Sequence, residues 1–135
     1  MAKLVWHMGR ITELKELVKI GSENFRTFDS YGFNRILAGM YIRTKALTML
    51  NLYHPEKSLE LIEEALEHGS DLYLDYLLKA ESLEALGRSE EAIELLQSSI
   101  EELKDRIAND TLPSLVKEEN QYFLVMMTQT LESWL

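Results

Sequence analysis

Paired carboxylates are the side chains of this sequence with the clearest capacity for general acid–base chemistry. Two such pairs, Glu63-Glu64 and Glu90-Glu91, lie in segments with helical periodicity. Consecutive residues on a helix point about 100° apart, so the two carboxylates of a pair diverge instead of converging on a substrate. A catalytic carboxyl would also need burial and a shifted pKa, and nothing in the pattern singles one out. The pairs therefore predict solvated helix surface.

Histidine and cysteine chemistry is equally sparse. His7, His54 and His68 are far apart, and the last two stand at expected helix ends, where an imidazole can meet free backbone carbonyls. The sequence has no cysteine, which removes thiolate nucleophiles, disulfides and sulfur ligands for zinc. Glycine-rich phosphate loops, metal-binding helices and nucleophile elbows are missing from the sequence as well. We therefore expect no enzymatic activity and no bound metal or cofactor.

The net charge of −9 is distributed unevenly along the chain. Residues 1–55 carry 8 basic and 4 acidic side chains, residues 56–105 carry 4 and 15, and residues 106–135 carry 2 and 4. So acidic a chain is unsuited to nucleic acid, and its longest apolar run, residues 122–127, is far shorter than the roughly 20 residues that cross a membrane. Without cysteine or a secretory signal, the expected location is cytoplasmic. The acidic segment is either solvated surface or a surface that attracts a basic partner.

The sequence matches itself when it is shifted by 34 positions. Residues 39–72 laid over residues 73–106 give eight identities, together with conservative pairs at the apolar sites. The identical pairs are Lys45/Lys79, Ala46/Ala80, Leu52/Leu86, Glu56/Glu90, Glu60/Glu94, Leu61/Leu95, Glu67/Glu101 and Asp71/Asp105. Because the matches fall where helices would bury side chains, they predict two copies of one helical unit.

Turn-forming residues divide each unit into two helices. In the first unit, one helix is expected over 30–52 and a second over 55–67, closed by His68-Gly69. In the second unit, a helix over 71–86 is followed by Gly87, which supplies a left-handed turn, and the next helix begins at Ser89. Each unit is thus an antiparallel pair of helices joined by a short turn.

The two units resemble the tetratricopeptide repeat (TPR) family, which has large and small residues at fixed sites of a 34-residue helix pair. The second unit reads Tyr76-x-x-Lys79-Ala80-x-x-Leu83 and Ala92-x-x-x-Leu96, and the first reads Ile42-x-x-Lys45-Ala46-x-x-Met49 and Ser58-x-x-x-Ile62. Lys45 and Lys79 depart from the family, which often has leucine there. The resemblance implies an all-α fold, a right-handed α-α superhelix of antiparallel helix pairs, with residues 1–135 forming a single domain.

Two flanking segments complete the expected domain. Residues 1–29 are expected to form a partial N-terminal repeat or cap, because residues 9–18 resemble residues 87–96, where a second helix begins. Residues 111–134 are expected to form a long C-terminal capping helix with Pro113 in its first turn. One stripe of this helix is apolar, as a helix that covers the last repeat requires.

The resemblance also implies how the chain acts. In TPR proteins the first helices of successive repeats line a concave groove, in which a peptide or a helix of another protein lies. The positions that carry over to this groove are Met40, Arg43, Leu47, Leu50, Asn51, Leu74, Leu77, Glu81, Glu84 and Ala85. Because Glu81 and Glu84 disfavour an anionic tail, we expect an adaptor or scaffold that binds an apolar or basic-amphipathic segment of a partner protein.

The C-terminal helix offers a second surface. Tyr122, Leu124, Met126 and Trp134 make it apolar on more than one face. A helix buried on two sides would explain this composition, and so would a surface that forms a homodimer or joins a longer repeat array. Self-association through this helix is therefore the alternative function.

Overall fold

The computed structural model describes the backbone of residues 2–25, 27–28 and 31–135, and the side chains of these residues from Gly9 onward. The fold is all-helical, as expected from the sequence. The α-helices are α1 (Ala2–Asn24), α2 (Gly32–Arg43), α3 (Pro55–Glu67), α4 (Leu74–Ala85), α5 (Ser89–Ala108) and α6 (Lys117–Trp134). Two short 3-10 helices, η1 (Thr48–Leu50) and η2 (Ser114–Val116), precede α3 and α6. No helix in the described part of the chain is long and apolar enough to cross a membrane.

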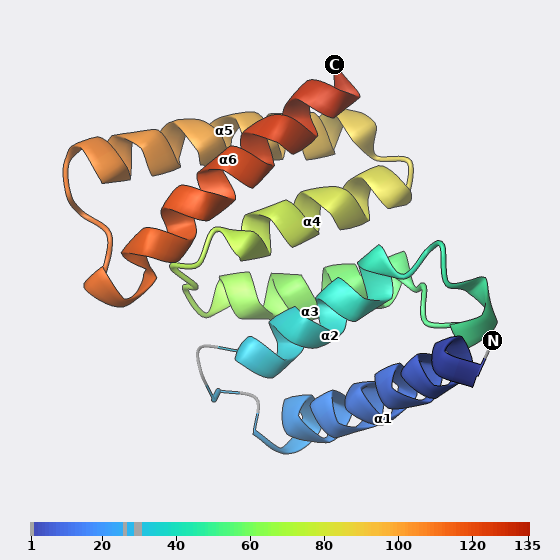
Figure 1. Ribbon diagram of the computed structural model, residues 1–135. Coiled ribbons are helices and arrows are strands. Elements are labelled where there is room, and N and C mark those ends of the chain that lie inside the picture. The colour runs from blue at the N-terminus through green and yellow to red at the C-terminus, as the bar shows by residue number, and fades with distance from the viewer. Residues whose placement is uncertain (1, 26, 29–30) are drawn as a thin grey trace.

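The helices form a stack in chain order. Each α-helix packs against the next one, from α1 at one end of the stack to α5 and α6 at the other (Figure 1). Contacts also join α2 to α4 and α4 to α6, so every second helix belongs to one row. This row brings together three segments that are far apart in the sequence.

Glycine and proline set several helix ends where the sequence predicts them. Gly69 and Gly87 follow α3 and α4 with φ angles of 80° and 77°, a left-handed conformation that glycine adopts without steric cost. Pro55 is the first residue of α3, where its missing N–H costs no hydrogen bond. The expected turns at these positions are therefore confirmed.

The expected helix over 30–52 is wrong at its C-terminal end, because α2 stops at Arg43. The Thr44 hydroxyl donates a hydrogen bond to the Met40 carbonyl at 2.7 Å, a local bond that competes with helix continuation. The chain then runs through η1 and a left-handed Asn51 before Leu52 enters the core at 3% exposure. Residues 29 and 30, where the start of this helix was expected, lie outside the described residues.

The connection between α2 and α3 changes the spacing of the repeat. The first residues of α3 and α5, Pro55 and Ser89, are 34 positions apart, but those of α2 and α4, Gly32 and Leu74, are 42 apart. The 34-residue match therefore relates the second helices of the two units, and its pairing of Ala46 with Ala80 is wrong. The residue of α2 that corresponds to Ala80 is Ala38, and both are fully buried.

Both flanking segments also differ from expectation in extent. A single helix, α1, occupies residues 2–24 of the expected partial N-terminal repeat, whose residues 1, 26 and 29 lie outside the described part. The C-terminal helix does not start near residue 111. Pro113 is extended, with ψ of 138°, and α6 begins only at Lys117 after the 3-10 turn η2. Pro113 thus precedes this helix instead of opening it.

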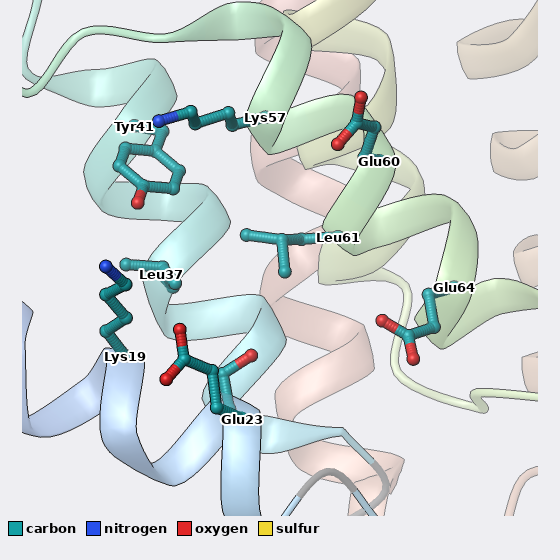
Figure 2. Close-up of a pocket in the computed structure, with 9 residues that line it drawn as sticks. Lys19, Glu23, Leu37, Tyr41, Lys57, Glu60, Leu61 and Glu64 are labelled. Carbon is teal, nitrogen blue, oxygen red and sulfur yellow. The ribbon is translucent and has the colours of Figure 1, made fainter.

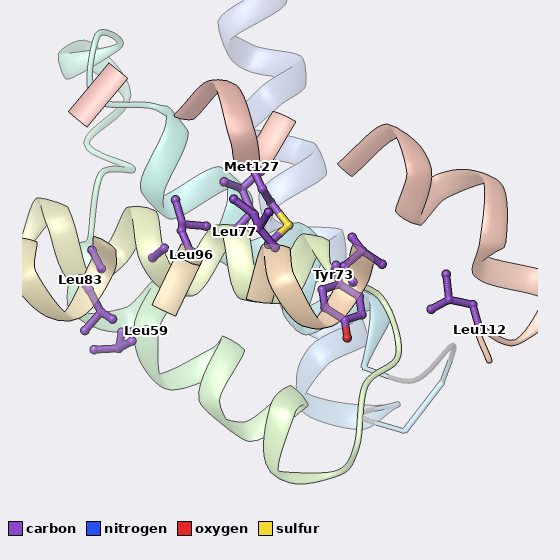
Figure 3. Close-up of a cluster of buried hydrophobic side chains, with 11 residues drawn as sticks. Leu59, Tyr73, Leu77, Leu83, Leu96, Leu112 and Met127 are labelled. Atoms are coloured by element: carbon purple, nitrogen blue, oxygen red, sulfur yellow. The ribbon is translucent and has the colours of Figure 1, made fainter. Parts of the chain in front are cut away.

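The largest hydrophobic cluster lies between α4, α5 and α6 (Figure 3). Its buried members are Leu59, Tyr73, Leu77, Ala80, Leu83, Ala92, Leu96, Ile100, Leu103, Leu112 and Met127. Met127 of α6 is fully buried in it, and burying a side chain of this size stabilises a fold by about 1.5–3 kcal/mol. The helix α6 therefore covers the last helix pair, as its apolar stripe predicts.

Two smaller clusters continue the core toward α1. One joins Ala38 and Ile42 of α2 to Ile62 of α3 and Leu78 of α4, and the other joins α1 to α2 through Val18 and Leu37. A buried ion pair adds a polar link between α2 and α4. The Arg35 guanidinium donates two hydrogen bonds to the Asp75 carboxylate, and the Nη2–Oδ2 bond measures 2.9 Å. Both apolar and polar contacts thus join neighbouring helices along the stack.

Candidate functional site

A pocket of about 400 Å³ opens where the C-terminal ends of α2, α4 and α6 meet. We call it the three-helix pocket. It is lined by Ile42, Arg43, Lys45, Tyr53, Glu81, Glu84, Ala85 and Trp134. The row of α2, α4 and α6 positions these residues, because each of the three helices ends at the pocket.

One acidic residue of the pocket is already neutralised within the chain. The Arg43 guanidinium forms a two-pronged pair with Glu81, with Nε–Oε2 at 3.1 Å and Nη2–Oε1 at 3.0 Å. This planar geometry matches a guanidinium to a carboxylate and holds both side chains in place. The pair is partly exposed, with 42% of the Arg43 side chain and 22% of the Glu81 side chain open to solvent. The Arg43–Glu81 pair therefore links α2 to α4 and carries no net charge.

The second acidic residue, Glu84, is not neutralised in this way. Its Oε2 atom is buried and accepts no hydrogen bond from any described residue. The one other cation in the pocket lining, Lys45, lies over the Tyr53 ring, with Nζ 5.9 Å from the ring centroid. A buried oxygen without a donor typically costs about 1–3 kcal/mol, and a charged oxygen costs more. The pocket is therefore lined by a glutamate whose buried oxygen lacks a hydrogen-bond donor.

Three residues, Trp134, Ile42 and Ala85, form the apolar part of the pocket. Trp134 stands at the end of α6 and is half-buried against the main cluster. Ile42 and Ala85 contribute aliphatic surface from α2 and α4. An acceptor beside apolar surface suits a ligand that has both a cationic and an apolar part.

The structure brings together only part of the groove that the sequence predicts. Arg43, Glu81, Glu84 and Ala85 all line the three-helix pocket, and Trp134, which was expected at an oligomer surface, joins them. Sequence reasoning missed this role of Trp134, because nothing local relates residue 134 to the end of α2.

Leu77 does not belong to a groove. It has no exposed surface and lies in the main cluster with Met127, because α6 covers this part of α4. Leu74 and Met40 are half-buried, and Leu74 packs against two of the clusters.

Three further groove positions stand apart from the first helix of their unit. Leu47, Leu50 and Asn51 follow the end of α2, in the connection that includes η1. Leu47 and Asn51 are exposed, and Leu50 is half-buried. The early end of α2 removes them from the helix row.

The residues of the expected oligomer surface also divide into two groups. Leu124, Met126 and Trp134 pack against the main cluster. Tyr122 is 63% exposed, and its neighbour on the same face, Val125, is 53% exposed. The helix α6 therefore buries one side against α4 and α5 and leaves a smaller apolar face open.

A second pocket, of about 360 Å³, lies between α1, α2 and α3 (Figure 2). Leu37 and Tyr41 of α2 face Leu61 of α3 there, and charged side chains of α1 and α3 surround them. These are Lys19, Glu23, Lys57, Glu60 and Glu64. No local sequence pattern predicts this pocket, because it depends on how α1 packs against the first unit.

Several polar groups of this second pocket interact with other residues of the chain. The Ser22 hydroxyl donates to Asn34 Oδ1 at 2.6 Å, and Asn34 Nδ2 donates to Glu64 Oε2 at 2.9 Å. Lys57 Nζ lies 5.8 Å from the centroid of the Tyr41 ring. Burial raises the pKa of the Tyr41 phenol above its ordinary value. This network joins α1 to α2 and α3, and it leaves the three-helix pocket as the better candidate for a binding site.

No family model, curated protein or solved structure matches the chain. The likeness to TPR units therefore rests on the residues that carry it.

Proposed function

We propose that the chain is a TPR-like adaptor that holds a basic-amphipathic segment of another protein in the three-helix pocket. The row of α2, α4 and α6 supports this arrangement, because α2 and α4 are the first helices of the two units. In a right-handed superhelix of such pairs, these helices form the inner, concave side. The cysteine-free composition suits a reducing compartment, so we place this activity in the cytoplasm.

The observation that carries the proposal is the buried, unpartnered Oε2 of Glu84. Once the Glu84 carboxylate turns toward the pocket, a lysine or arginine of the bound segment would donate to this oxygen and recover the free energy that its isolation costs. Glu81 does not compete for this cation, since Arg43 already engages both of its oxygens. The cation is thus directed to one atom.

An apolar side chain of the same segment would lie against Trp134, Ile42 and Ala85. Aromatic anchors in half-buried pockets dominate many protein interfaces. A segment with a cationic and an apolar residue close together, either extended or as one face of a helix, satisfies both parts of the pocket. The acidic surface of residues 56–105 would attract such a basic segment and repel nucleic acid.

The proposal is tested by selection from a random peptide library displayed on phage. Peptides that bind the wild-type chain are expected to combine lysine or arginine with aliphatic or aromatic residues. Ala85→Arg places a bulky cation at the pocket and is expected to abolish binding of these peptides. Glu90→Gln removes a carboxylate from the exposed start of α5 and is expected to leave binding unchanged, which makes it the matched control.

Circular dichroism of each variant shows that the helices are intact. Acidic consensus peptides, or peptides that bind the Ala85→Arg variant as tightly as the wild type, would reject the pocket as the binding site.

A further inference from the structure

The pocket between α1, α2 and α3, which we call the α2 pocket, has a counterpart in the second helix pair. This counterpart, the α4 pocket, has a volume of about 450 Å³ and is lined by Lys79, Leu83, Glu91, Glu94, Leu95 and Ser98. The helix α4 begins 42 positions after α2, and α5 begins 34 positions after α3, so each of these residues has an equivalent in the first pair. In the same order, the equivalents are Leu37, Tyr41, Lys57, Glu60, Leu61 and Glu64, and all of them line the α2 pocket. The same arrangement of helices therefore builds both pockets, and their side chains differ.

The charges of the α4 pocket are largely neutralised within the chain. Lys79 forms an ion pair with Glu63 of α3, with Nζ–Oε1 at 3.1 Å. Glu91 forms an ion pair with Arg88, with Oε2–Nη2 at 2.6 Å. Two of the three charged residues that line this pocket thus already have a partner.

The charges of the α2 pocket are arranged differently. Lys19 and Glu23 of α1 and Lys57 and Glu60 of α3 line it, and none of these four forms an ion pair within the described part of the chain. Their spacings of four and three residues would allow a pair along each helix, but no pair is present. The α2 pocket therefore keeps two cations and two anions available to a ligand.

Apolar surface separates the cations from one of the anions. Lys57 Nζ lies 5.8 Å from the centroid of the Tyr41 ring, and Figure 2 shows the Lys19 side chain directed toward the same part of α2. Leu61 points toward α2, and the Glu60 carboxylate lies on the far side of Leu61 in this view. In the α4 pocket the equivalent of Leu37 is the paired Lys79, so the apolar floor beneath Leu61 is particular to the α2 pocket.

We infer that the α2 pocket binds a small dipolar molecule that carries a carboxylate and an ammonium at the two ends of an apolar body. The carboxylate meets Lys19 and Lys57, the ammonium meets Glu60, and the body lies over Leu37 and Leu61. The volume of about 360 Å³ falls within the range of small-molecule sites, roughly 300–1,000 Å³. An ω-amino acid and a short peptide with free ends share this chemistry. The inference is independent of the three-helix pocket.

Nuclear magnetic resonance titration of the isotope-labelled chain with 6-aminohexanoate tests the inference. The backbone amide signals of residues 19–23, 37–41 and 57–64 are expected to shift. Hexanoate and hexylamine keep the length of this molecule and each lacks one charge, so each is expected to bind about fivefold more weakly. The dipeptide leucyl-leucine carries both charges on a peptide. If it binds more tightly than 6-aminohexanoate, the inference holds with a short peptide as the ligand, and if it binds more weakly, the inference holds with an amino acid.

Two substitutions assign the charges to the two ends of the ligand. Lys57→Gln is expected to lower the affinity for 6-aminohexanoate and for hexanoate but not for hexylamine. Glu60→Gln is expected to lower the affinity for 6-aminohexanoate and for hexylamine but not for hexanoate. Both residues are exposed, so the helices are expected to stay intact. Glu94→Gln, at the equivalent of Glu60 in the α4 pocket, is the matched control and is expected to leave all three affinities unchanged.

Four results would overturn the inference. The signals around the α2 pocket could stay in place with both dipolar molecules, or the three six-carbon molecules could bind equally. Signals around the α4 pocket could shift as much as those around the α2 pocket. Glu94→Gln could weaken binding as much as Glu60→Gln.

Discussion

Replacing Arg35 with methionine is expected to lower the free energy of unfolding by about 3–5 kcal/mol, because it leaves the Asp75 carboxylate buried without its cation. The two side chains are 9% and 0% exposed, and Arg35 Nη2 also contacts the Ser70 hydroxyl at 3.3 Å. A domain of this size has a total stability of about 5–15 kcal/mol, so the loss is a large part of it. The expected fall in melting temperature is about 10–20 °C.

Urea unfolding followed by circular dichroism measures this loss. An unchanged m-value shows that unfolding exposes the same surface area as in the wild type. The double variant Arg35→Met/Asp75→Leu is expected to recover most of the lost stability, because replacing a buried pair with apolar residues is often nearly neutral. Arg43→Met is the control, since its pair with Glu81 is partly exposed and is expected to contribute about 0–1 kcal/mol. Two results would refute the reasoning. One is a loss of less than about 1 kcal/mol in the free energy of unfolding for Arg35→Met. The other is a double variant whose loss equals the summed losses of Arg35→Met alone and Asp75→Leu alone.

Other properties of the fold can be tested by single substitutions. Gly87→Ala is expected to lower the free energy of unfolding by about 1 kcal/mol, because Gly87 has a φ of 77°. Gly9→Ala is expected to raise it by about the same amount, because Gly9 lies inside α1 and no atom lies near its added Cβ. Urea unfolding measures both changes, and changes of the same sign would contradict these expectations. Asn120→Ala removes the side-chain oxygen that accepts a hydrogen bond from the Tyr73 backbone N–H at 2.8 Å and the amide that donates to the Asp71 carbonyl. The backbone amides of α6 are therefore expected to exchange hydrogen faster. Unchanged exchange would show that these two hydrogen bonds do not stabilise α6. Burial raises the pKa of Tyr73 to about 12, while the unfolded phenol titrates near pH 10. The folded state therefore keeps a proton that the unfolded state releases, so this stabilisation is complete below pH 10 and is lost between about pH 10 and 12. The urea midpoint is expected to fall less steeply across that range in Tyr73→Phe, and an identical slope would contradict the assignment.

The sequence predicts those parts of the fold that depend on local chemistry. Gly69, Gly87 and Pro55 mark helix ends because their backbone preferences need no tertiary context. The end of α2 was not predictable in this way, because residues 44–52 continue a helical pattern of apolar residues. Tertiary contacts accompany the end of this helix, because Leu52 is buried in the core and α3 packs back against α2.

The pocket was predictable only in part for a similar reason. Glu81, Glu84 and Ala85 share one side of α4, and helical spacing alone brings them together. Spacing also places Leu77 with this group, but Leu77 is buried in the main cluster with Met127 of α6. The place of Trp134 beside Arg43 depends on the packing of α6, which no local pattern encodes.

The most direct measurement of the proposed function is the affinity of one peptide from the selection for the wild type and for Glu84→Gln. Titration followed by the fluorescence of Trp134, in a Trp6→Phe background that leaves it as the sole tryptophan, reports occupancy of the pocket itself. The substitution keeps the shape of the side chain and removes its charge. If a cation of the peptide binds Glu84, the dissociation constant is expected to rise by about tenfold or more, which corresponds to the roughly 1.5–3 kcal/mol of a charged hydrogen bond. An affinity that is unchanged by Glu84→Gln, or a Trp134 signal that does not respond to the peptide, would contradict the account.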